Sequence, residues 1–169
     1  MIIAEAIADR KTQFPSAIES NAVGTVSQEL KTEAAKDLEN AVSSSVFWAA
    51  TVLQAKAQSR LSELAQIGSN WDTYGAPAPN QTALESAVRV LEHMNPFDLM
   101  LANIVPSAEG GVGFCFSRGD RYADIESSND GDIIGVRYVG MQTPVLIETD
   151  GTDESIEAAL QQVRNHIRA

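Results

Sequence analysis

Apolar residues between Ser27 and Gly68 recur close to every 3.6 positions, which predicts a helical region over 27–68. Ser27 is a favourable N-cap, and Gly68 is a typical C-terminal stop. One unbroken helix of this length would extend roughly 60 Å, which exceeds the diameter of a small domain. We expect either a break at the three serines 43–45, which gives an antiparallel helical hairpin, or one long helix that needs a partner.

The segment before this helix contains residues that interrupt regular structure. Phe14-Pro15-Ser16 and Asn21-Ala22-Val23-Gly24 follow a single weak helical stretch. We therefore expect residues 1–26 to form a loosely ordered arm.

Residues 69–169 show a different pattern. A helix is predicted from Asn80 or Thr82 to about Met94, because Thr82 and Glu85 have the spacing of a capping box. Asn95-Pro96 ends it, and 97–102 is expected to be a short turn or a connector.

Four strands are predicted after this connector, over residues 111–116, 122–127, 133–139 and 145–148. Short turns separate them, which indicates an antiparallel meander. A last helix begins at Thr152, with Ile156, Leu160, Val163 and Ile167 on one apolar face. The expected fold is α+β, with the C-terminal helix packed on one face of a four-stranded sheet.

Two motifs flank the helix that begins near Asn80. They are Trp71-Asp72-Thr73-Tyr74-Gly75-Ala76 and Pro106-Ser107-Ala108-Glu109-Gly110-Gly111-Val112. Together they resemble a family of small uncharacterised bacterial proteins with the patterns W-D-x-Y-G-A and P-[ST]-x-[DE]-G-G-[VI]. The resemblance covers residues 60–140 and implies a bacterial or phage origin. It implies no activity and no site residue.

Charge is distributed unevenly along the 169 residues. The chain has 12 basic and 23 acidic side chains, a formal charge of -11, and residues 71–169 carry -9 of it. With 44% hydrophobic residues the chain can still build a globular core. Phosphate backbones and anionic lipids repel such a protein, so we expect no direct nucleic-acid binding and no membrane partner.

Cysteine use and the first residues bear on the compartment. Cys115 is the single cysteine, so an intrachain disulfide is excluded. A protein without disulfides is compatible with a reducing cytoplasm. Glu5 and Asp9 interrupt the apolar start, which also lacks a basic region, so we expect no signal peptide. The sequence predicts a cytoplasmic protein without a cofactor.

Acidic residues are densest between 120 and 157. Strand alternation places Tyr122, Asp124 and Glu126 on one side, which we expect to face solvent. The simplest interpretation is a solvated acidic face. The alternative is a metal-dependent hydrolase in which Asp124, Glu126 and Glu148 hold a divalent ion or act as acid and base.

Other candidate residues have structural interpretations beside functional ones. Asn129-Asp130-Gly131-Asp132 predicts a hairpin turn, because a calcium loop would require glutamate where Arg137 stands. Cys115 paired with His93 or His166 would make a nucleophile, but a histidine near a helix C-terminus more often caps it.

Aromatic residues give two further candidates. Trp71 and Tyr74 flank Asp72 and suit a small ligand or a peptide, whereas the structural alternative has Trp71 packed as a plug and Asp72 bound to turn amides. Val46, Phe47 and Trp48 are adjacent apolar residues that one helix face cannot bury. They indicate an oligomeric contact, or a segment enclosed between helix and sheet.

We expect a non-enzymatic acidic interaction protein that forms a homodimer and binds a basic protein partner. A bacterial or phage neutralising, immunity or anti-defence role fits, because an acidic face can occupy a nucleic-acid-binding groove. A metal-dependent hydrolase and a ligand-binding or peptide-binding module are the alternatives. The expected partner-binding residues are Asp124, Glu126, Asp130, Asp132, Trp71 and Tyr74, and the expected oligomer contacts are Val46, Phe47, Trp48 and Leu53.

Overall fold

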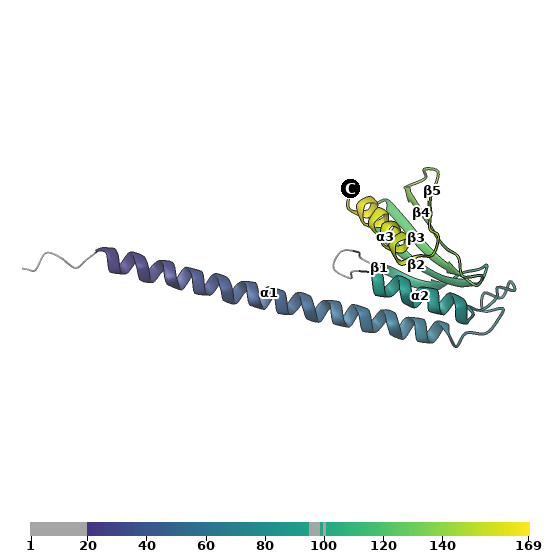
Figure 1. Ribbon diagram of the computed structural model, residues 1–169, viewed down its shortest axis with the longest axis horizontal. Helices are drawn as coiled ribbons and strands as arrows, with labels where there is room; N and C mark the ends of the chain where they lie inside the picture. The colour runs from purple at the N-terminus through teal and green to yellow at the C-terminus, as the bar shows by residue number, and fades with distance from the viewer. Residues whose placement is uncertain (1–19, 95–98, 100) are drawn as a thin grey trace, which may run out of the picture. The chain divides into compact units, whose positions relative to one another are not determined.

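The computed structural model describes residues 20–94, 99 and 101–169 (Figure 1). The chain divides into two units, Met1–Ser44 and Ser45–Ala169. The described part of the first unit is the N-terminal part of helix α1, and the second unit contains the rest of α1 and all other elements. The elements are α1 (Ser20–Leu64), α2 (Gln81–His93), β1 (Leu101–Pro106), β2 (Gly111–Arg118), β3 (Arg121–Ser128), β4 (Ile133–Val139), β5 (Val145–Glu148) and α3 (Asp153–Arg168). The α+β class is confirmed.

Helix α1 is continuous from Ser20 to Leu64 and passes through the serines at 43–45. The predicted hairpin is therefore wrong, and the alternative of one long helix is confirmed. A serine costs only roughly 0.5 kcal/mol relative to alanine inside a helix, so three of them do not end it. The helix also includes residues 20–26, which we expected to precede it, and residues 1–19 of the predicted arm lie outside the described residues.

The sheet has five strands in the order β1-β2-β3-β4-β5, each antiparallel to its neighbour. The predicted meander is confirmed, but the strand count of four is wrong, because β1 occupies part of the expected connector. Its pairing with β2 shifts register between Leu101 and Asn103, which disrupts the two-residue period. Pro106 is tolerated at its end because β1 is an edge strand.

The core lies on one side of this sheet. Helices α2 and α3 pack on that side (Figure 1), and the part of α1 within the second unit adds Ala57, Leu61 and Leu64 to the same cluster. Arg60 Nε also donates to the Ile104 carbonyl of β1 at 3.0 Å. The buried apolar side chains of the strands are Ile104, Val112, Phe114, Phe116, Ala123, Ile125, Ile133 and Ile147.

Both shorter helices have side-chain caps. Asn80 Oδ1 accepts the Ala83 N–H at 3.0 Å, so α2 begins after Asn80, as one of our two alternatives predicted. The capping box between Thr82 and Glu85 is wrong, because Glu85 instead accepts from Gln81 Nε2 at 2.8 Å. Thr152 caps α3, as predicted.

Asn129, in the turn between β3 and β4, connects the segment that follows the first sequence motif to Gly110 of the second. Its Oδ1 accepts the Asn80 N–H at 2.8 Å, and its Nδ2 donates to the Ala78 carbonyl at 3.0 Å. Its backbone N–H donates to the Gly110 carbonyl at 3.3 Å. Gly110 has φ +90°, and a Cβ there would lie 2.3 Å from Asn129 Nδ2 and 2.9 Å from Pro77 Cγ, so only glycine fits. We call these contacts the Asn129 clasp.

The substitution Asn129→Ala tests the clasp. It would leave the Asn80 N–H and the Ala78 carbonyl without their partner, and we expect the free energy of unfolding to fall by about 1–3 kcal/mol. Urea denaturation measures this change. The control is Asp130→Ala in the same turn, an exposed site that should change stability by no more than about 0.5 kcal/mol. Equal losses in the two variants would contradict the assignment.

Candidate functional site

The side of the sheet opposite α2 and α3 is the candidate functional surface. Along β3, Ala123 and Ile125 are buried, while Tyr122, Asp124 and Glu126 alternate with them and are at least partly exposed. The alternation therefore has the orientation that the sequence indicates. We call this side the open face, and by strand register it comprises Asn103, Val105, Gly113, Cys115, Ser117, Tyr122, Asp124, Glu126, Ile134, Val136, Tyr138, Leu146 and Glu148.

Strand pairing places the carboxylates among apolar and aromatic neighbours. Asp124 lies between Cys115 and Val136, and Tyr122 stacks on Tyr138 with ring centroids 5.2 Å apart and planes 17° from parallel. This pairing brings together residues from three strands, and it gives the open face an aromatic pair one row from Asp124.

Apolar side chains on the open face are also accessible to solvent. Ile134 lies between Glu126 and Glu148 and is 44% exposed, and Leu146 is 54% exposed. Sequence reasoning missed Ile134, Leu146 and Tyr138. Alternation along 133–139 could have grouped Ile134 with Tyr138, but both sides of that strand contain apolar residues.

Charge differs sharply between the two sides of the sheet. Asp124, Glu126 and Glu148 lie on the open face, which has no basic side chain among its residues. None of these three carboxylates forms an ion pair within the described residues. The arginines of β2, β3 and β4 (Arg118, Arg121 and Arg137) alternate to the covered side.

Cys115 is poorly suited to nucleophilic chemistry. Burial and the neighbouring Asp124 carboxylate raise the pKa of its thiol to about 11. At neutral pH the thiol therefore remains protonated, and the thiolate is the reactive form.

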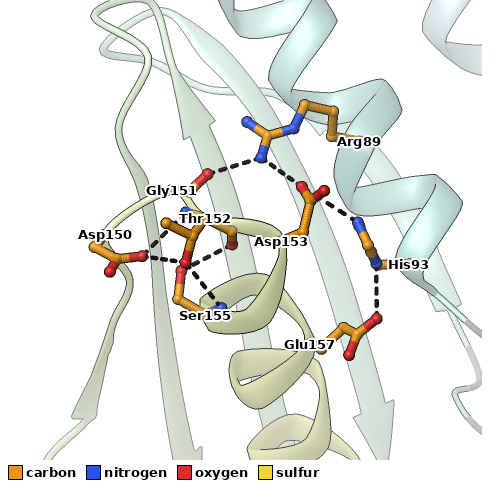
Figure 2. Close-up of polar contacts among 8 residues, drawn as sticks. All are labelled: Arg89, His93, Asp150, Gly151, Thr152, Asp153, Ser155 and Glu157. Atoms are coloured by element: carbon orange, nitrogen blue, oxygen red, sulfur yellow. Dashed lines mark hydrogen bonds and ion pairs between the residues drawn. The ribbon is translucent and has the colours of Figure 1, made fainter.

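His93 is held between helices α2 and α3 (Figure 2). Its Nδ1 lies 3.1 Å from Glu157 Oε1, and its Nε2 lies 3.4 Å from Asp153 Oδ1. Arg89 Nη2 lies 2.6 Å from the same Asp153 oxygen and also donates to the Gly151 carbonyl at 2.8 Å. The Arg89 guanidinium lowers the pKa of Asp153. This cluster joins the two helices.

His166 is likewise engaged on the covered side of the sheet. It is buried, and its Nε2 lies 3.0 Å from the Tyr138 carbonyl. Arg121 Nη1 donates to the His166 carbonyl at 3.3 Å, near the end of α3. Because Cys115 belongs to the open face, the alternative pairing of Cys115 with His93 or His166 is wrong.

The carboxylates of the open face are spread over the sheet. Ile134 separates Glu126 from Glu148, so these two lie two strand spacings apart, roughly 10 Å. Within the described ranges, no group of three or more histidine, cysteine or acidic side chains is placed to hold a metal ion.

Asp130 and Asp132 are exposed in the turn between β3 and β4. The Ser128 N–H donates to the Asp132 carbonyl at 2.8 Å, and Gly131 has φ +94°. The predicted hairpin turn is confirmed. It lies at the end of the same strand that carries Asp124 and Glu126.

The Trp71 loop is tied together by its own hydrogen bonds. Asp72 Oδ1 accepts the N–H groups of Tyr74 and Ala76 at 2.9 and 3.0 Å, and the bond from Ala76 lowers the pKa of Asp72 most. Trp71 Nε1 donates to the Pro77 carbonyl at 3.2 Å, while Tyr74 is 93% exposed. Asp72 thus binds turn amides, as the structural interpretation predicts, but its other part is wrong, because Trp71 is 37% exposed and is not packed as a plug.

The residues expected to form an oligomer contact are accessible on α1. Phe47 and Trp48 are 65% and 64% exposed, so the alternative in which helix and sheet enclose them is wrong. Leu53 is 50% exposed and borders a hollow of about 520 Å³ between α1 and β1. The side chain of Val46 lies outside the described part of the chain.

No family model, curated protein or solved structure matches the chain. In the part of the chain that the structure describes, no helix combines the length and the apolar character needed to cross a membrane.

The pKa of Cys115 can be tested through its alkylation rate. We expect the rate with iodoacetamide, followed by mass spectrometry, to rise with a midpoint near pH 11 rather than the ordinary 9.0. Asp124→Asn should lower that midpoint, because it removes the negative charge beside the thiol. Glu126→Gln removes the carboxylate charge two residues further along β3, and it should lower the midpoint less than Asp124→Asn does. A midpoint near 9.0 in the wild-type folded protein would show that the thiol is not perturbed.

Proposed function

We propose that the chain is a non-enzymatic interaction protein whose open face binds a basic protein partner. The observation that carries this proposal is the separation of charge across the sheet. Three carboxylates of β3 and β5 lie on the open face, and the arginines of β2, β3 and β4 lie on the covered side. A basic surface that approaches the open face meets uncompensated negative charge.

Electrostatics supports recognition of a basic partner over other classes. Residues 71–169 carry -9 of the formal charge, so the field attracts cations over a distance of several ångströms and repels phosphate groups. Such complementarity raises the association rate and excludes acidic competitors. The acidic turn at Asp130 and Asp132 extends the field past the end of β3.

The same surface has the features of an interface centre. Tyr122 and Tyr138 form a stacked pair, and Ile134 and Leu146 expose apolar area beside it. Aromatic and apolar groups supply most of the affinity in protein interfaces, while charged groups supply specificity. An arginine of the partner would contact both a carboxylate and an aromatic ring within this patch.

A bacterial or phage neutralising, immunity or anti-defence role is the biological context we propose. A partner that binds nucleic acid presents a basic groove, and an acidic sheet face can occupy that groove. Neither the hydrolase nor the ligand-binding alternative has a specific observation in its favour.

The double substitution Asp124→Lys/Glu126→Lys tests the proposal. The probe is a synthetic peptide rich in arginine and lysine that has no acidic residue, and calorimetry measures its dissociation constant. We expect the constant to rise about a hundredfold in the variant, because two favourable charges become repulsive. Binding to the wild type should weaken as salt is added.

The matched control is Glu33→Lys/Glu39→Lys, which changes the net charge equally on exposed positions of α1. We expect this control to raise the dissociation constant of the peptide by no more than about threefold. Amide resonances of β3 and β4 should shift on peptide addition, and those of 31–45 should not. Equal weakening in both variants, or no shift in β3 and β4, would overturn the proposal.

A further inference from the structure

Three arginines lie toward one end of the sheet, on the side that carries α2 and α3. They are Arg118 at the end of β2, Arg121 at the start of β3 and Arg137 in β4. We call them the arginine cluster. Because the open face is acidic, the cluster gives the other side of the sheet a charge of opposite sign.

Strand pairing brings the three side chains within reach of one another. Arg118 and Arg121 are directly opposite each other across the hairpin that joins β2 to β3. Arg121 pairs with Val139, so Arg137, two residues earlier in β4, is its diagonal neighbour. Opposite residues on one side of a sheet have Cβ atoms about 5 Å apart, and diagonal residues lie about 7–8 Å apart, distances that long side chains span.

No carboxylate neutralises these charges within the described residues. Like charges that are directly opposite destabilise a sheet, and the chain has 23 acidic side chains that could compensate them. Arg60 and Arg89, elsewhere in the second unit, each form an ion pair with a carboxylate, at 2.8 and 2.6 Å. No arginine of the cluster does so, and Asp120 in the intervening turn pairs with none of them.

Most hydrogen-bond donors of the cluster are also unused in the part of the chain that the structure describes. Arg121 Nη1 donates to the His166 carbonyl at 3.3 Å, which satisfies one carbonyl near the end of α3. Arg137 Nε is buried and has no hydrogen-bond partner. Buried donors in native proteins are nearly always satisfied, so this atom indicates an acceptor from outside the chain. A water molecule could accept from one donor, but it would not neutralise three charges.

The exposure of the cluster and its surroundings favour a small ligand. Arg118 is exposed and the other two arginines are half-buried, so the cluster is accessible beside the hairpin. The formal charge of -11 repels extended polyanions such as nucleic acids. A small anion at the cluster interacts mainly with the nearest groups, because salt screens exposed charges beyond about 8 Å.

Guanidinium chemistry indicates which small anion fits. The planar fork of an arginine donates two parallel hydrogen bonds to a pair of oxygens, as in its complexes with phosphate and carboxylate groups. Three neighbouring guanidinium groups are matched best by an anion with two negative charges and oxygens that point in several directions. A tetrahedral phosphate group has both properties. A single carboxylate has one charge and two oxygens in one plane.

We propose that the arginine cluster binds a small oxyanion with two negative charges, of the phosphate type. Arg118 and Arg121 hold the anion across the hairpin, and Arg137 donates to it from the diagonal position. The cluster and the carboxylates of the open face lie on opposite sides of the sheet, so this inference does not depend on the proposed function.

Nuclear magnetic resonance of the full chain tests the inference, with inorganic phosphate titrated at constant ionic strength. We expect saturable shifts of arginine Nε–H resonances and of the backbone amides of 117–122. Acetate should bind at least about tenfold more weakly, because it has one charge. Tighter binding of methyl phosphate than of inorganic phosphate would identify a phosphate ester as the ligand, and the reverse would identify the free anion. The absence of saturation up to about 50 mM phosphate, or equal binding of acetate, would overturn the inference.

Variants of the cluster assign the binding to its residues. Arg118→Gln/Arg137→Gln should raise the dissociation constant of phosphate at least about tenfold. Lys36→Gln/Lys56→Gln removes the same charge from exposed positions of α1 and should change the constant by less than about twofold. Arg118→Gln alone, at an exposed position, keeps the test decisive if the double variant does not fold, and it should raise the constant at least about threefold. Equal effects of the cluster variants and the lysine control would contradict the assignment.

Discussion

Each strand of the meander directs alternate side chains to opposite sides of the sheet, and α2 and α3 cover one side. The register of β3 is therefore strongly constrained. A slip of one residue would bury Asp124 and Glu126 and expose Ala123 and Ile125, at the cost of two desolvated carboxylates and the loss of core packing. The alternation that builds the core thus also determines the charge of the open face. Fold stability and surface chemistry rest on the same pattern.

The Asn129 clasp explains why two separate motifs accompany this sheet. Ala78 follows the W-D-x-Y-G-A loop, and Gly110 belongs to the second motif; both are hydrogen-bonded to Asn129. The side-chain amide of Asn129 satisfies backbone groups that no strand or helix partner reaches. The clasp joins the start of α2 to the turns at one end of β2 and β3. Gly110 of the second motif therefore has a structural role at this end of the sheet.

Local patterns predicted much of the fold, and long-range contacts account for what they missed. The sequence predicted the alternation along 122–127 because all residues on one side of that strand are small or apolar. The sequence did not predict β1, because the register shift after Leu101 and the proline at 106 disrupt its two-residue alternation. The break at 43–45 was wrong because serine weakens a helix without ending it. The contacts of Asn129 with Asn80 span 49 residues and those of His93 with Glu157 span 64, so no local pattern contains them.

The charge of the open face decides which surfaces it attracts. Asp124, Glu126 and Glu148 lie on that face with no basic side chain among its residues, so two copies of it repel each other, whereas a basic surface is attracted. The stacked Tyr122–Tyr138 pair and the exposed Ile134 lie among these carboxylates. Charge that guides an approaching surface and apolar area that contacts it therefore come from the same strands.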